Sequence, residues 1–202
     1  IAFNQTGHGF GNHMTPGPGR DYTLLMPNIH DVVEYVDKLP DCAKDSKGAA
    51  RIGFIGASTG GIMALTHAYS NSKIRCIVAL SHIHDYRELL SPQSQKGYGL
   101  FSIQRLFKTM LKLMKVKLDY TEEENKMISP KYFLRPDPKN KDRLYLVHCK
   151  DDPLPFAEAL KSKALAELPD ENCLFLETGG HGFRAQETTI TAVISKWLEK
   201  SL

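Results

Sequence analysis

Residues 52–60 read Ile-Gly-Phe-Ile-Gly-Ala-Ser-Thr-Gly, a short apolar run that ends in the pattern Gly-x-Ser-x-Gly around Ser58. Such a run is typical of a buried strand, and the apolar residues at 62–69 predict a helix directly after it. A serine between that strand and that helix sits on a strained turn, where Gly56 and Gly60 are expected to prevent a Cβ from colliding with neighbouring backbone. The stretch therefore indicates an α/β architecture and makes Ser58 a candidate nucleophile.

The rest of the chain alternates short apolar runs with segments of helical period. This alternation predicts βα units, and hence a mostly parallel sheet with helices on both faces. We expect further strands at residues 1–4, 74–80, 144–147 and 173–176, and helices at residues 155–168 and 184–200. Another helix is expected to be capped by Asn28 followed by Asp31. In the last helix an apolar stripe that includes Trp197 predicts core packing.

A long segment separates the strands that are expected to end at Leu80 and begin at Leu144. It greatly exceeds the ~2 to 6 residues usual for a connecting loop in an α/β unit. We therefore divide the chain into a core at residues 1–80 and 142–202 and an inserted helical cap at residues 81–141. Within the cap, residues 101–118 form a basic amphipathic pattern. Packing of its apolar stripe over the site is favoured over docking to a membrane surface.

Composition limits the class of protein. The 202 residues, 42% hydrophobic and 24% charged, suit one globular domain with an insertion, and no apolar run approaches the ~20 residues of a membrane span. A net charge of +3 is too small and too evenly spread for a nucleic-acid binder. The scattered cysteines favour free thiols in a reducing, cytoplasmic compartment over a zinc site or a disulfide framework. They are Cys42, Cys76, Cys149 and Cys173.

A serine nucleophile needs a base of near-neutral pKa and a carboxylate that orients this base. His181 is the favoured base because glycines flank it in a loop directly after the last expected strand. Asp152 is the favoured acid because it follows the preceding strand and starts an Asp-Pro step that forces a turn. Its neighbour Asp151 is a near rival. The Thr59 backbone N–H, at the start of a helix, is expected to be one oxyanion donor.

The order Ser58, Asp152, His181 and the elements that carry these residues resemble the α/β-hydrolase family over nearly the whole chain. Residues 148–152 resemble the H-G-x-x-D segment of that family, with Cys149 in place of the glycine. The resemblance is to the branch of capped esterases, monoacylglycerol lipases and serine aminopeptidases. It implies hydrolysis through an acyl-enzyme, which requires no metal or organic cofactor.

Some members of the family take the acid from the strand before, where this chain has Asp85, so Asp85 is the second candidate. His82 and His84 point to opposite faces of an extended segment, and without a carboxylate cluster beside them we expect structural or cap-contact roles rather than metal binding. His8 resembles two places in the family, the oxyanion loop and the loop after the following strand. The later loop fits better, because only about fifty residues, with no further strand expected before Ile52, separate His8 from Ser58. The first strands of the sheet and the second oxyanion donor are therefore expected to precede Ile1.

The expected substrate is a small-molecule ester with a hydrophobic acyl or alcohol part. The reason is that the cap sequence predicts a layer of apolar side chains, including Phe and Met, over the active site. A serine aminopeptidase or amidase is the first alternative, because similar caps occur in those enzymes. The second alternative is a non-catalytic binding protein that retains the fold.

Overall fold

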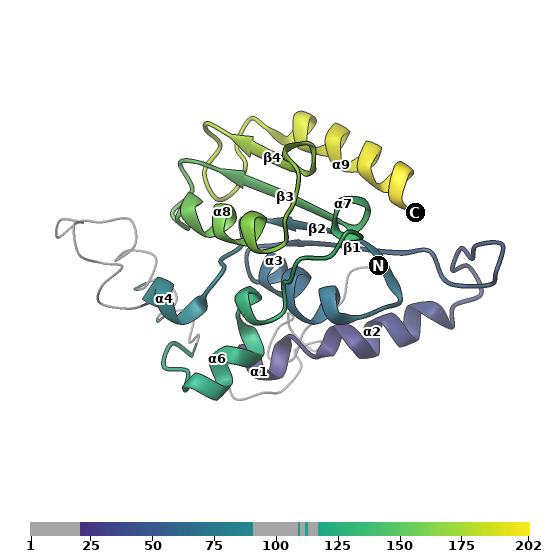
Figure 1. Cartoon of the computed structure of the whole chain (residues 1–202), viewed down its shortest axis with the longest axis horizontal. Helices are drawn as coiled ribbons and strands as arrows, with labels where there is room; N and C mark the ends of the chain where they lie inside the picture. Colours follow the sequence, from purple (N-terminus) through teal and green to yellow (C-terminus); the bar gives the residue numbers. More distant parts are fainter. Residues whose placement is uncertain (1–20, 91–108, 110–111, 113–116) are drawn as a thin grey trace, which may run out of the picture.

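Four parallel strands form the centre of the computed structural model, which describes residues 21–90, 109, 112 and 117–202 (Figure 1). They are β1 (Ile52–Ala57), β2 (Ile74–Leu80), β3 (Leu144–Cys149) and β4 (Cys173–Leu176). Each strand pairs with the next one along the chain, so the order is β1-β2-β3-β4 and the carboxyl ends share one edge. The predicted parallel sheet is confirmed, whereas the strand expected at residues 1–4 lies outside the described residues.

Successive side chains of the central strands enter two different apolar clusters, one on each face of the sheet. Ile77 and Leu146 belong to the cluster that also contains side chains of α2, α3 and α8. Their neighbours Val78 and Val147 belong to the cluster that contains α9. The Trp197 ring of α9 lies 5.2 Å from the Tyr145 ring, between centroids, which confirms its role in the core. Helices therefore cover both faces, as the sequence predicts (Figure 1).

The helical elements include the helices expected after residue 28 and at residues 62–69, 155–168 and 184–200, with shifted ends, and several short elements that the sequence did not predict. In chain order, the helical elements are α1 (Tyr22–Leu25), α2 (Asn28–Asp37), α3 (Thr59–Met63), the π-helical turn η2 (Ala64–Ala68), α4 (Tyr86–Leu90), α6 (Glu122–Ile128), the 3₁₀ turn η3 (Pro130–Tyr132), α7 (Asn140–Arg143), α8 (Phe156–Leu165), the 3₁₀ turn η4 (Asp170–Asn172) and α9 (Glu187–Ser201). The capping role expected for Asn28 is wrong. Pro27 occupies the N-cap with a φ of −62°, because its ring already holds a helical φ, and Asn28 is the first helical residue.

The turn between β1 and α3 brings three segments of backbone into close contact. A Cβ on Gly56 would lie 2.0 Å from the Gly60 carbonyl oxygen, so Gly56 has the role expected from the sequence. Gly60 does not, because a Cβ there would meet no atom within 4 Å. The second crowded position is Gly61, where a Cβ would lie 2.5 Å from the Leu80 carbonyl oxygen of β2. The sequence pattern therefore identified one of the two required glycines and missed the other.

We predict that Gly61→Ala destabilises the protein by about 1–3 kcal/mol, because the added methyl group has to push α3 away from β2. Gly60→Ala is the matched control, one residue away in the same helix. Its methyl group enters open space, and its free energy of unfolding should stay near wild type or rise slightly. Urea unfolding followed by circular dichroism measures both. Equal destabilisation of the two variants would contradict the packing described for this turn.

Part of the segment predicted as the cap is described, and it packs against the core. An aromatic cluster joins Tyr22 of α1, Tyr86 of α4 and Tyr120 before α6, with ring centroids 5.3 Å apart for Tyr22–Tyr86 and for Tyr86–Tyr120. The cap boundaries at residues 81–141 stay a prediction, and the amphipathic helix expected at 101–118 lies almost entirely outside the described residues. Among the described residues no helix is both long and apolar enough to span a bilayer.

A chain of hydrogen bonds ties α6 to α2 through two histidines. Nε2 of His67 lies 3.1 Å from the Met127 carbonyl oxygen, which can only accept, so this nitrogen carries the proton. Nδ1 of His67 then accepts from His30 Nε2 at 3.4 Å, and His30 Nδ1 accepts from the Asn71 amide at 3.1 Å. The neutral form of His67 satisfies both of its ring nitrogens in this arrangement. Burial lowers the pKa of His67 below its ordinary value of 6.5, which also favours the neutral form.

We predict that acid weakens the folded state partly through His67. Below pH 6.5 the unfolded chain binds a proton at His67 that the folded chain resists, so the free energy of unfolding falls as the pH drops from 7 to 5. His67→Gln should be less stable than wild type at pH 7 but should lose less stability over this pH range. Urea titrations at several pH values measure both slopes. Identical slopes would show that His67 does not carry this proton linkage.

Candidate active site

Ser58 lies at the carboxyl edge of the sheet, between the end of β1 and the start of α3. Its φ of 56° and ψ of −117° are rarely adopted by a residue with a side chain. The surrounding structure holds this conformation, since the Ser58 N–H donates to the Leu80 carbonyl oxygen at 3.0 Å and the Ser58 carbonyl oxygen accepts from Ile62. Strained backbone of this kind concentrates at functional sites, where it presents a side chain.

His181 lies in the loop between β4 and α9 and its ring reaches Ser58. Nε2 of His181 is 3.0 Å from the Ser58 hydroxyl oxygen. On its other side, Nδ1 is 3.0 Å and 3.1 Å from the two carboxylate oxygens of Asp152. The structure thus brings together three side chains that the sequence placed at residues 58, 152 and 181.

Asp152 is the buried end of this chain of hydrogen bonds. Its side chain is fully buried, whereas the His181 side chain is 31% exposed. Burial acts to raise the pKa of the Asp152 carboxyl, but hydrogen bonds from His181 and from the Leu154 N–H, the latter at 2.8 Å, outweigh it. The pKa of Asp152 therefore lies below its ordinary value of 3.8. An ionised carboxylate accepts the Nδ1 proton of His181, which leaves Nε2 free to accept from the Ser58 hydroxyl.

The two rival carboxylates bind other partners. Asp85 is buried at the start of α4, where its carboxylate accepts from the Asn125 amide at 3.0 Å and forms an ion pair with Lys131. Asp151 accepts from the backbone N–H groups of Gly179 and Gly180. Of the three carboxylates weighed from the sequence, Asp152 is the one that hydrogen-bonds to His181.

Thr59 is the first residue of α3, at the start of a helix as the sequence predicts, and its role as an oxyanion donor stays a prediction. Its hydroxyl donates to the Tyr22 hydroxyl oxygen at 3.0 Å, and the Tyr22 backbone N–H donates to the Tyr120 hydroxyl oxygen at 2.9 Å. Sequence reasoning missed both tyrosines, because their approach depends on how α1 and the segment before α6 fold back onto α3. The second oxyanion donor, expected upstream of Ile1, stays a prediction.

The histidines at 82 and 84 have separate surroundings. His82 is fully buried, and burial holds its pKa well below 6.5; its ring lies 6.0 Å from that of His148, between centroids. His84 Nδ1 lies 3.1 Å from the Ser162 hydroxyl oxygen of α8. Among the residues that the structure describes, no three His, Cys, Asp or Glu side chains converge as a metal site would require. All four cysteines are free.

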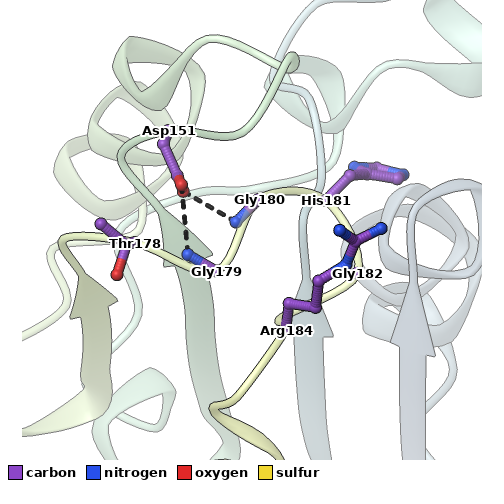
Figure 2. A pocket seen from close by; sticks show the side chains of 7 residues that line it. All are labelled: Asp151, Thr178, Gly179, Gly180, His181, Gly182 and Arg184. Carbon is purple, nitrogen blue, oxygen red and sulfur yellow. Dashed lines mark hydrogen bonds between the residues drawn. The ribbon is translucent and has the colours of Figure 1, made fainter.

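A hollow of about 520 Å³ lies beside the loop between β4 and α9 that carries His181, called the histidine loop below. Figure 2 shows the residues that line it. Each residue that lines it is polar or glycine. The apolar cover expected over the site involves residues 101–118, almost all of which lie outside the described residues. Ser58 does not line the hollow, and His181 is the one member of the three-residue chain that does. The lining residues are Asp151, Thr178, Gly179, Gly180, His181, Gly182 and Arg184.

Comparison with known proteins identifies the fold. No family model matches the chain, and no curated protein matches it in sequence. Several solved structures do match. The structure of DcsB in complex with its substrate analogue has a TM-score of 0.62 at 14% identity, over 98% of this chain and 79% of that one. The acylaminoacyl peptidase of Pyrococcus horikoshii has a TM-score of 0.61 at 16% identity, over 91% and 29% of the two chains.

Acetyl xylan esterase 1 from a Thermoanaerobacterium species has a TM-score of 0.52 at 16% identity, over 89% of this chain and 53% of that one. The protein therefore has the α/β-hydrolase fold, as the order of its motifs implied. It spans less than a third of the matched peptidase and about half of the esterase. At identities of 14–16%, these similarities establish the fold but do not identify the substrate.

We predict that Asp152→Asn slows the reaction of Ser58 with a fluorophosphonate by about 10³- to 10⁴-fold, because an amide favours the wrong His181 tautomer. Asp85→Asn is the comparison, since it removes another buried carboxylate, one that binds Lys131 instead of His181. It should lower the free energy of unfolding and leave the labelling rate near wild type. Second-order labelling rates, measured by intact mass, separate the two. Equal, small losses would remove Asp152 from the role of acid.

Proposed function

We propose that the protein is a serine hydrolase that cleaves carboxylic esters through an acyl-enzyme intermediate. One observation carries this proposal: an unbroken chain of hydrogen bonds from the Ser58 hydroxyl through both nitrogens of His181 to the buried carboxylate of Asp152. A serine hydroxyl is a weak nucleophile at neutral pH and becomes reactive when an oriented base removes its proton. The geometry supplies that base within direct reach.

In the first half of the proposed reaction, the Ser58 hydroxyl oxygen attacks the ester carbonyl while its proton moves to Nε2 of His181. Asp152 stabilises the imidazolium that forms, and it stays ionised because its pKa is low. The Thr59 N–H donates to the oxyanion of the tetrahedral intermediate. Nε2–H of His181 then protonates the departing alcohol, which leaves an acyl group on Ser58.

In the second half, His181 takes a proton from a water molecule that attacks the acyl group. The tetrahedral intermediate collapses, the acid is released, and the proton returns from Nε2 of His181 to Ser58. The Ser58 hydroxyl oxygen and Nε2 of His181, which exchange the proton, lie 3.0 Å apart in the structure. The chain's own residues account for every proton transfer in this scheme.

The hydrogen bonds among Ser58, His181 and Asp152 do not distinguish an ester from an amide substrate, so this choice has separate support. The proposed hydrophobic acyl or alcohol part follows from the apolar stripe in the sequence of residues 101–118, which lies between β2 and β3. The matched structures include both an esterase and an acylaminoacyl peptidase, so a serine aminopeptidase or amidase is the second candidate. A binding protein without activity is less favoured, because strain at Ser58 and burial of Asp152 both cost stability.

We predict that Ser58→Ala abolishes covalent fluorophosphonate labelling and lowers kcat for a p-nitrophenyl ester by at least about 10³-fold. Ser70→Ala is the control, because the Ser70 hydroxyl donates to helix carbonyl oxygens of Thr66 and His67, away from the site. Its labelling and turnover should equal wild type. Labelling that survives Ser58→Ala would exclude Ser58 as the nucleophile, and an inert wild type would favour the binding protein.

The same assay, extended to a panel of short and long acyl esters and aminoacyl amides, compares kcat/KM between substrate classes. We expect higher kcat/KM for the esters, with a gain as the acyl chain lengthens. Higher values for the amides would replace the esterase by the aminopeptidase or amidase. Either result leaves the proposed roles of Ser58, His181 and Asp152 in place.

A further inference from the structure

Asp151, which follows β3, binds the histidine loop through two hydrogen bonds that backbone N–H groups of the loop donate to its carboxylate. One carboxylate oxygen accepts from the Gly180 N–H at 2.8 Å and the other accepts from the Gly179 N–H at 3.2 Å (Figure 2). The residue itself is exposed, unlike its neighbour Asp152. Two consecutive N–H groups are therefore bound to one carboxylate directly before His181.

These bonds continue the pairing of β3 with β4 beyond the point where the two strands stop. The last backbone bond at this edge runs from the Lys150 N–H to the Leu176 carbonyl oxygen, at 2.8 Å. After it, the side chain of Asp151 replaces the backbone as the acceptor for the opposite segment. The start of the histidine loop therefore stays next to the segment after β3, as in a sheet, although it is no longer part of a strand.

The loop needs such a restraint because its glycines are conformationally free. Gly179 has a φ of 139° and Gly180 a φ of 60°, values that glycine adopts at little cost but leaves easily. The loop also closes on itself, since the Arg184 N–H donates to the Gly179 carbonyl oxygen at 2.8 Å. Asp151 binds this closed loop at Gly179 and Gly180, and therefore determines where the backbone of His181 lies.

We propose that Asp151 is a positioning residue for His181, and that the two adjacent aspartates divide one task between them. Asp152 holds the imidazole ring, and Asp151 holds the backbone from which the ring extends. This inference rests on the proposed function for its effect on rate, but the geometry that it describes does not. A histidine base displaced by about 1 Å loses on the order of 10²-fold in rate.

The test replaces Asp151 by alanine and by asparagine in the full chain. Asp151→Ala should lower kcat for the p-nitrophenyl ester by about 10- to 100-fold with little change in KM, because substrate contacts remain and the base moves. Asp151→Asn keeps one oxygen that accepts from backbone and should recover part of this loss. Lys150→Ala is the matched control, since it breaks the exposed ion pair with Glu177 between the same two loops and should leave kcat unchanged.

A double-mutant cycle tests whether the effect passes through His181. In the His181→Ala background, Asp151→Ala should cause no further loss of the residual rate. If Asp151→Ala lowered the rate equally in the wild-type and His181→Ala backgrounds, the proposal would be overturned. An unchanged kcat in Asp151→Ala, or an equal fall of kcat in Lys150→Ala, would also overturn it. A fall in kcat without recovery in Asp151→Asn would likewise contradict it.

A second measurement is independent of activity and separates failure of this inference from failure of the proposed function. In proton NMR at low temperature, the Nδ1–H of His181 bound to Asp152 should give a downfield resonance in wild type and in Lys150→Ala. Asp151→Ala should broaden or remove it. If wild type is inactive but shows these changes, the proposed function fails and the positioning role stands. An unchanged resonance in Asp151→Ala would overturn the positioning role.

Discussion

Helix α3 starts in direct backbone contact with β1 and β2, and this contact determines where Ser58 can lie. Gly56 and Gly61 allow the approach, since a Cβ on either would overlap a carbonyl oxygen. The hydrogen bond from the Ser58 N–H to Leu80 then fixes the strained turn against β2. A looser turn would relax Ser58 toward ordinary backbone angles and turn its hydroxyl away from His181. The position of the Ser58 hydroxyl therefore depends on the close packing of α3 against β1 and β2.

The order of the strands explains why the loops that carry Asp152 and His181 meet at Ser58. Ser58 follows β1, whereas His181 follows β4, three strand spacings or about 14 Å across the sheet. A loop that returns over this distance needs unusual backbone angles, and it has positive φ at Gly179, Gly180 and Phe183. Asp152 follows β3, which lies between β1 and β4 in the sheet, and its carboxylate hydrogen-bonds to the His181 ring. Because β3 neighbours β4, the same turn also brings Asp151 to the glycines of the loop.

Sequence alone predicted the parallel sheet, its four described strands and the three side chains that meet at its edge. The strands could be predicted because strand periodicity is a local signal. The three side chains could be predicted because each follows such a strand directly, at the Gly-x-Ser-x-Gly turn, the Asp-Pro step or the glycine-flanked loop. The importance of Gly61 over Gly60 was missed because it depends on the position of Leu80 in another strand. The partners of Asp151 and the contact of Tyr22 with Thr59 were missed for the same reason, since they join residues 28 and 37 positions apart.

The most direct test of the account is a crystal structure of the protein after reaction with a fluorophosphonate. The account predicts a covalent bond from phosphorus to the Ser58 hydroxyl oxygen and a phosphoryl oxygen within hydrogen-bond distance of the Thr59 N–H. His181 should remain between this adduct and Asp152. An adduct on another residue, or one on Ser58 whose phosphoryl oxygen points away from Thr59 with His181 displaced from Asp152, would contradict it.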